Sequence, residues 1–184
     1  HIYLVKLMNN YTNLNYNKEI NFIYHISDIH IHLQSKHTEY LNVFDNLYTY
    51  LNQEKEKGIN GVIVITGDIL HSKTELTPEC IEITRVFFNK LSSIFTLIFI
   101  AGNHDVNLSN SERLDSLTPI YNGLDNKENC YYLKDTGLYH FNDIIFSVSS
   151  IRDYEIINPE IIKKSEYYTE KTKLICLFHG RVDG

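Results

Sequence analysis

Four apolar runs of the sequence each end in polar side chains of the kinds that bind metal ions. In chain order these residues are Asp28 with His30, Asp68, Asn103 with His104, and His179. Carboxylate, amide oxygen and imidazole ligands together suit first-row divalent cations, and a pair of such ions can hydrolyse phosphate esters. The pattern therefore predicts a two-metal hydrolytic centre. Asp68 is the carboxylate best placed to be shared between the two ions.

The elements that must position these residues alternate between strands and helices. Residues 21–26, 61–66 and 96–101 are apolar runs that predict strands buried in a sheet, and the second run is typical of a strand covered on both faces. Apolar residues spaced three and four apart predict a helix over 38–57, and Thr77-Pro78 is a helix start. Strands that alternate with helices indicate a largely parallel sheet, in which ligands bind at the carboxyl ends of the strands.

The second half of the chain has a different pattern. Residues 137–141 and 144–149 are apolar runs around a polar two-residue turn, which predicts an antiparallel hairpin. Pro159 is expected to open a short helix, and 173–178 predicts a last strand that ends at His179. The fold class is therefore α/β. Gly67 and Gly102, which precede Asp68 and Asn103, are expected to let the backbone turn and approach the ions closely.

The amino-acid composition limits the binding partners and the cellular location that can be expected for the protein. The chain has 184 residues, of which 43% are hydrophobic, and a net charge of −6, so it has no overall attraction for nucleic acid or an anionic membrane. No apolar run is long enough to cross a bilayer, so no membrane partner is expected. Cys80, Cys130 and Cys176 form no CxxC pair and are interpreted as core residues. We therefore expect an intracellular protein, nuclear or cytoplasmic, that is not secreted.

At these residues the chain resembles the calcineurin-like metallophosphoesterase superfamily. That superfamily has the pattern DxH, GD, GNH(D/E), His and GHxH, and the first four elements are present in order: Asp28-Ile29-His30, Gly67-Asp68, Gly102-Asn103-His104-Asp105 and His179. The resemblance implies a four-layer α/β/β/α sandwich over residues 20–184, truncated at its C-terminus because GHxH and its metal-binding imidazoles are missing. Residues 1–19 are expected to be an N-terminal extension or the remnant of a tag.

Finer details resemble one branch of the superfamily. Gly67-Asp68-Ile69-Leu70-His71 with GNHD is similar to the SbcD-type nucleases of DNA double-strand-break repair, and no Asp-Arg-Gly of the phosphoprotein phosphatases follows. The resemblance implies a DNA exonuclease or endonuclease in which a metal-activated water attacks phosphorus. It also implies a homodimer and an ATPase partner. Two divalent ions are expected, with Mn²⁺ favoured over Mg²⁺, Zn²⁺ or Fe²⁺.

The same resemblance implies a role for each site residue. The metal ligands are Asp28, His30, Asp68, Asn103 and His179. His104 would protonate the leaving oxygen or stabilise the transition state, and His71 would orient the phosphate or the nucleophile. His32 and Asp105 are assigned to the substrate side.

Two other functions remain open from the sequence. A phosphodiesterase or phosphatase acting on small phosphoesters or phosphoproteins would use the same metal centre without salt-dependent DNA binding. A catalytically silent binding or assembly module would keep the fold and bind DNA or a partner without metal-dependent turnover.

Overall fold

A computed structural model of the chain describes residues 11–32, 36–110, 112–153 and 155–180. The strands are β1 (Tyr11–Asn13), β2 (Phe22–Ile26), β3 (Gly61–Thr66), β4 (Thr96–Ile100), β5 (Cys130–Tyr132), β6 (Gly137–Phe141), β7 (Ile144–Ser149) and β8 (Lys173–Phe178). The helices are α2 (His37–Glu56), α3 (Pro78–Ile94), α4 (Leu117–Asn122) and α5 (Pro159–Ile162), with a 3₁₀ turn, η2, at Lys127–Asn129.

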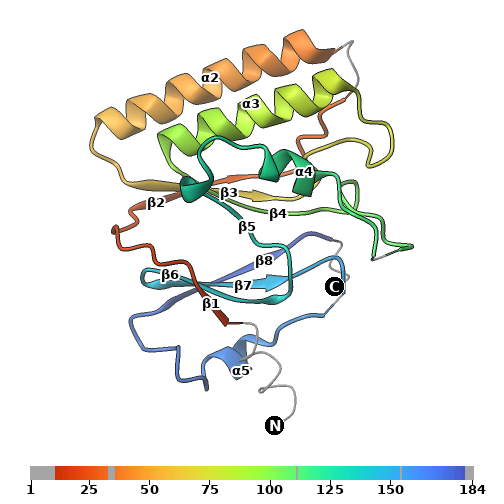
Figure 1. Cartoon of the computed structure of the whole chain (residues 1–184). Coiled ribbons are helices and arrows are strands. Elements are labelled where there is room, and N and C mark those ends of the chain that lie inside the picture. The colour runs from red at the N-terminus through yellow and green to blue at the C-terminus, as the bar shows by residue number, and fades with distance from the viewer. Residues whose placement is uncertain (1–10, 33–35, 111, 154, 181–184) are drawn as a thin grey trace.

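These elements form two four-stranded sheets that face each other between helices (Figure 1). One sheet has the order β2-β3-β4-β5, and α2 and α3 lie over its outer face. The other has the order β1-β6-β7-β8, with α5 on its far side. The layers confirm the predicted α/β/β/α arrangement.

The side chains of β3 and β4 point alternately to the two faces of the β2-β3-β4-β5 sheet, and this explains why the sheet lies between two apolar layers. Successive side chains of a strand point to opposite faces of its sheet. Ile63 and Ile65 pack with the apolar side chains of α2 and α3, whereas Val62 and Val64 belong to the core between the two sheets. Every residue of both strands is buried. Both apolar runs are therefore strands covered on both faces, as was predicted for the run 61–66.

The two long helices begin and end close to the predicted residues. In α3 the Thr77 side chain accepts a hydrogen bond from the Cys80 amide, and Pro78 occupies the first helical turn. In α2 the buried residues are Phe44, Tyr48 and Leu51, which share one face. None of the described helices combines the length and the apolar character needed to cross a membrane.

The second sheet confirms the predicted hairpin. Strands β6 and β7 are antiparallel, and the turn between them contains Asn142 at a φ of 57°. Asparagine is one of the residues that tolerate this left-handed conformation. Strand β8 runs parallel to β7 and ends at Phe178, immediately before His179.

Three details of the sequence interpretation are wrong. β2 was expected to be buried but is an edge strand that pairs only with β3, so Phe22 is 52% exposed. β1 lies inside the predicted N-terminal extension, yet it pairs in parallel with β6, and Tyr16 stacks on Phe141. Residues 11–19 are thus part of the fold, whereas residues 1–10 lie outside the described part. Cys176 is exposed on β8, although the other two cysteines are buried.

Candidate metal centre

Backbone pairing between β2 and β3 continues beyond the strands and aligns the first predicted ligands. The amide of Asp28 donates to the carbonyl of Gly67 at 3.2 Å, and the amide of His30 donates to the carbonyl of Asp68 at 2.9 Å. One residue pair further along, Ile31 and Leu70 form a parallel bridge. The two loops are therefore held side by side by main-chain hydrogen bonds, which places His30 next to Asp68.

Three of the predicted ligands have a left-handed backbone. The φ angles are 55° at Asp28, 48° at His30 and 50° at Asp68, and Gly67 before Asp68 has a φ of 89°. Positive φ is uncommon outside glycine, and unusual backbone conformations of this kind cluster at functional sites. These angles turn the chain sharply at the end of each strand.

The carboxylate of Asp68 lies at the centre of the group. Its Oδ2 atom is 3.6 Å from Nε2 of His30, and its Oδ1 atom is 3.3 Å from Nε2 of His179. Oδ1 also accepts a hydrogen bond of 2.9 Å from the amide of His104. The side chain of Asp68 is almost completely buried. Each carboxylate oxygen thus faces a different imidazole, which is the arrangement that a carboxylate shared by two ions needs.

His179 is oriented by a main-chain contact. Its Nδ1 atom lies 2.7 Å from the carbonyl oxygen of Thr66, so Nδ1 carries the proton and donates it. Nε2 is then the nitrogen that faces Asp68, and it also lies 3.2 Å from Oδ1 of Asn103. The structure brings Asn103 and His179 together although 76 residues separate them.

Asp28 completes the group from the exposed side. Its Oδ1 atom is 3.9 Å from Nε2 of His30, and its side chain is 58% exposed. Ligand atoms of Asp28, Asp68 and His179 lie within 4.8 Å of one another. Two carboxylates, an amide oxygen and imidazoles make a donor set that fits divalent first-row cations.

Two glycines allow the loops to approach this closely. A Cβ atom on Gly67 would lie 2.6 Å from Nδ1 of His179, and one on Gly102 would collide with the amide and the carboxylate of Asp68. The glycines therefore allow the loops to lie close to one another, and their close approach to the ions stays a prediction.

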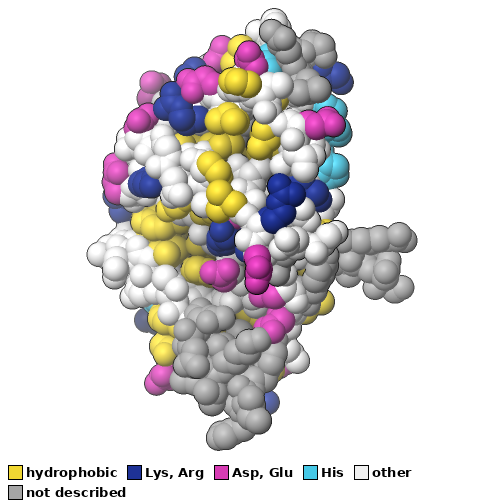
Figure 2. Space-filling model, turned by 45° about the vertical axis from the view of Figure 1, so that its right-hand side comes forward, with side chains coloured by type: hydrophobic (Ala, Val, Ile, Leu, Met, Phe, Trp, Pro, Cys, Tyr) yellow, Lys and Arg dark blue, Asp and Glu magenta, His cyan; other side chains and the backbone are white. Residues whose placement is uncertain are grey.

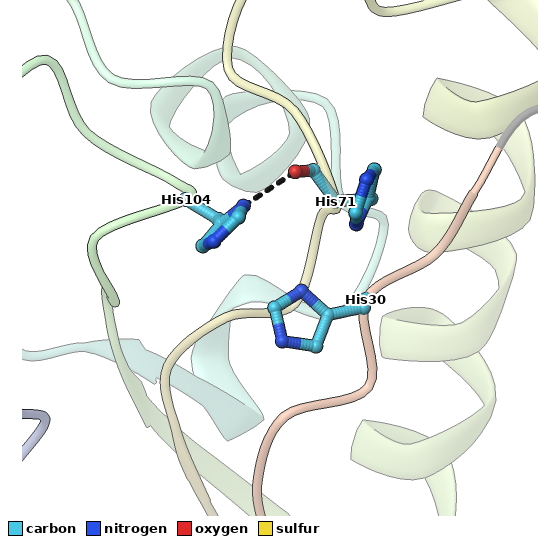
Figure 3. A group of neighbouring side chains, drawn as sticks. All are labelled: His30, His71 and His104. Carbon is cyan, nitrogen blue, oxygen red and sulfur yellow. Dashed lines mark hydrogen bonds between the residues drawn. The ribbon is translucent and has the colours of Figure 1, made fainter.

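A second group of imidazoles lies beside the carboxylates. His30, His71 and His104 come from the loops after β2, β3 and β4 and point toward one another (Figure 3). Nδ1 of His104 lies 2.6 Å from the carbonyl oxygen of His71. The ring of His32 stacks on His71 with 3.5 Å between ring centroids. Partial burial, together with the nearby His71, lowers the pKa of His32.

The structure corrects the assignment of Asp105 to the substrate side. The residue has no accessible surface. Its carboxylate accepts hydrogen bonds from the amides of Ile69, Leu70 and Gly102 at 3.2, 3.0 and 2.9 Å. Burial raises the pKa of Asp105 to about 6, and the negative charge of the neighbouring Asp68 adds to this rise. The three hydrogen bonds act in the opposite direction and lower the pKa, but they do not outweigh burial. Asp105 therefore braces the loops after β3 and β4 and does not contact substrate.

Sequence reasoning missed three residues that shape the site. The carbonyl of Thr66 orients His179, and the hydroxyl of Tyr40 donates to the carbonyl of His30 at 2.6 Å. Lys73 donates to the carbonyl of Asn103 at 3.1 Å and lines a surface pocket of about 330 Å³ with His71 and His104. Only Lys73 carried a signal, because it is a cation two residues after His71.

Comparisons with known proteins agree with this geometry. The family model described as calcineurin-like phosphoesterase matches residues 23–183. The chain is also 44% identical to "Uncharacterized protein R555" of Acanthamoeba polyphaga mimivirus, over 167 residues that make up 89% of the chain. The matched region is 12% of that viral protein, so the chain spans only a small part of its relative's length.

Proposed function

The chain belongs to the calcineurin-like phosphoesterase family, and from this premise we propose that it hydrolyses phosphate esters with two divalent cations held at the strand ends. The observation that carries the proposal is the position of Asp68, whose two oxygens each face a different imidazole. A carboxylate shared in this way reduces the repulsion between two neighbouring cations.

The proposed ligands divide into two sets that share Asp68. Asp28 and His30 would hold one ion, and Asn103 and His179 the other. When bound, the two ions would polarise the phosphoryl group and activate a water molecule for attack. Mn²⁺ is the ion we propose, because carboxylate and amide oxygens suit it and imidazole is compatible with it.

His104 is the proposed general acid. Its Nδ1 proton is donated to the carbonyl of His71, so Nε2 is the nitrogen left to carry a second proton toward the leaving oxygen. His71 and Lys73 line the adjoining pocket. These side chains offer positive charge and hydrogen-bond donors to the phosphate of a substrate, and His32 holds the plane of the His71 ring by stacking on it.

DNA is the narrower substrate proposal. Its support is the resemblance of Gly67–His71 and of GNHD to the double-strand-break repair nucleases. Charge adds no support, because on the face that Figure 2 shows, the described lysines and arginines are interspersed with aspartates and glutamates and form no continuous basic stripe. A homodimer and an ATPase partner belong to this narrower proposal as well.

Hydrolysis assays separate the general proposal from the narrow one. The chain, Asp68→Asn and the surface control Asp45→Asn are incubated in excess Mn²⁺ with an aryl phosphodiester, an aryl phosphomonoester and labelled duplex DNA. The expected result is diester hydrolysis that is lost in Asp68→Asn and kept in Asp45→Asn. Asp45 is a suitable control because its side chain is 69% exposed on α2.

The outcomes discriminate between the three functions. Release of nucleotides from DNA supports the nuclease proposal, whereas cleavage of the small ester without DNA cleavage contradicts it and favours a small-substrate enzyme. Absence of hydrolysis of every substrate by chain saturated with Mn²⁺ contradicts the general proposal and favours the silent binding module.

A further inference from the structure

The group of three imidazoles has the dimensions of a metal site of its own. One nitrogen from each of His30, His71 and His104 lies within 4.8 Å of the others. The ring centroids are 4.8 Å apart for His30 and His104, 5.7 Å for His30 and His71, and 5.6 Å for His71 and His104. Three imidazoles bound to one tetrahedral zinc ion at about 2.0–2.1 Å have centroids roughly 5 Å apart. Small side-chain rotations would therefore bring the three rings onto one ion.

An unpaired nitrogen points into this group. Nδ1 of His30 is buried and has no hydrogen-bond partner among the described residues. Nε2 of the same ring is the atom that faces Asp28 and Asp68. In Figure 3 the nitrogen nearer the His30 main chain lies on the side of the ring that faces His71 and His104. A buried polar atom without a partner is uncommon, and an ordered water or a bound ion can supply the partner that the protein atoms do not.

The two ring nitrogens of His104 have different roles, and one of them is available to bind zinc. Nδ1 is engaged with the carbonyl of His71, so Nε2 remains for a ligand. Metal-binding histidines commonly donate their other ring N–H to a carbonyl in this manner, which fixes the tautomer and the ring orientation. The stacking of His32 on His71 restrains the third ring.

The donor set selects a different ion from the one proposed for the carboxylates. Three imidazoles without a carboxylate suit Zn²⁺, whereas Mn²⁺ prefers carboxylate and carbonyl oxygens. The two neighbouring groups of side chains therefore differ in the cation that each prefers.

We propose that His30, His71 and His104 form a zinc site whose occupation inhibits the enzyme. The inhibitory effect rests on the proposed phosphoesterase function, but zinc binding itself does not. With Nε2 bound to zinc, His104 cannot protonate a leaving oxygen. Withdrawal of His30 toward His71 and His104 also weakens its contact with the carboxylates of the Mn²⁺ centre.

Metal titrations without substrate test the site directly. Zn²⁺ and Mn²⁺ affinities are measured by competition with a chromogenic chelator for the chain, for His71→Gln and for the control His140→Gln, whose residue lies on β6 away from the site. Loss of a second-shell partner typically weakens metal binding about 10- to 100-fold, so loss of the ligand His71 should weaken zinc at least ~10-fold. Mn²⁺ affinity should not change, because His71 is not among its proposed ligands.

The variant Asp28→Asn should show the reverse of the result expected for His71→Gln. This variant should lose Mn²⁺ affinity and keep zinc affinity. If zinc affinity instead falls in Asp28→Asn and is unchanged in His71→Gln, zinc occupies the carboxylates and the proposed site does not exist. Co²⁺ in place of zinc adds a spectroscopic check, since tetrahedral Co²⁺ absorbs visible light strongly and this band should disappear in His71→Gln.

The inhibitory part is tested in the Mn²⁺-dependent assay. Micromolar zinc should suppress diester hydrolysis by the chain and by His140→Gln, and the zinc concentration for half-inhibition of His71→Gln, relative to its own zinc-free rate, should rise at least ~10-fold. Zinc that binds the three histidines and leaves hydrolysis unchanged would refute the inhibition. A chain without any hydrolytic activity would refute the proposed function but leave the zinc titrations valid.

Discussion

Nδ1 of His104 lies 2.6 Å from the main-chain carbonyl oxygen of His71, and this contact decides which nitrogen of His104 is available for chemistry. A carbonyl can only accept a hydrogen bond, so Nδ1 must carry the proton. Nε2 is then the available nitrogen of a ring that lines a pocket together with His71 and Lys73. The contact also joins the loops after β3 and β4.

Replacement of His104 by alanine should remove turnover and spare metal binding. General acid catalysis contributes roughly 100- to 10,000-fold in rate, so Mn²⁺-dependent hydrolysis should fall by that amount. Mn²⁺ affinity, measured by calorimetry, should stay within about twofold, since His104 is not a proposed ligand of that centre. His140→Gln serves as the histidine control. An equal fall in affinity and in rate would contradict the role of general acid.

A methyl group on Gly102 should disrupt the centre. The added Cβ would meet the amide and the carboxylate of Asp68, and overpacking of this kind costs about 1–3 kcal/mol. Urea unfolding and Mn²⁺ titration of Gly102→Ala should show lower stability and weaker binding together. Gly123→Ala is the matched control, because its Cβ would meet its nearest atoms at an ordinary 3.6 Å. A Gly102→Ala variant with unchanged stability and binding would contradict the observed close approach.

Mn²⁺ itself should stabilise the folded chain. An ion that binds only the native state at 100 times its dissociation constant adds about 2.7 kcal/mol to the free energy of unfolding. Thermal unfolding with Mn²⁺ and with excess chelator should therefore differ, and the difference should disappear in Asp68→Asn but persist in Asp45→Asn. A difference that survives in Asp68→Asn would place the ion elsewhere.

Stability should fall in acid through Asp115. This carboxylate is buried and accepts hydrogen bonds from Thr118, Lys134 and Arg152. Burial opposes its ionisation, but the Lys134 ammonium and the Thr118 hydroxyl and amide outweigh burial and lower the pKa of Asp115. The folded state thus favours the ionised form. The resulting stabilisation is complete above the unfolded pKa of about 3.9 and is lost as the pH falls through the lower folded value.

Urea unfolding as a function of pH checks this expectation. At pH 7, Asp115→Asn should be about 1–3 kcal/mol less stable than the unmodified chain, because Lys134 and Arg152 lose the buried negative charge with which they pair. The gap should shrink below about pH 4. Asp45→Asn, at an exposed position, is the control. A gap that stays constant down to pH 2 would show that the charge of Asp115 does not stabilise the fold.

The sequence predicted the buried parts of this fold better than its edges. The apolar run 61–66 has one reasonable interpretation, because β-branched residues without a polar face fit a strand covered on both sides. The run at 22–26 looks similar, but its exposure depends on sheet order, which the local pattern does not contain. β1 and β5 have three residues each, too few to show a period.

In the candidate site, too, some features follow from the local sequence and others depend on the whole fold. Side chains at the ends of parallel strands were predictable because those ends meet at one edge of a sheet. The burial of Asp105 was not, since its three hydrogen-bond donors belong to two loops whose approach depends on the whole fold. The orientation of His179 by the carbonyl of Thr66 likewise involves a main-chain atom, and sequence patterns describe side chains only.

The left-handed backbone at Asp28, His30 and Asp68 lowers the stability of the fold that carries the candidate metal centre. Conformations of this kind cost on the order of 1–3 kcal/mol each, and glycine would relieve them. A variant that is not selected for metal binding would therefore gain folding stability when these three residues are replaced by glycine. Folding stability and the proposed metal binding oppose each other at these three positions, so directed evolution for heat resistance alone should replace these residues before it alters the core.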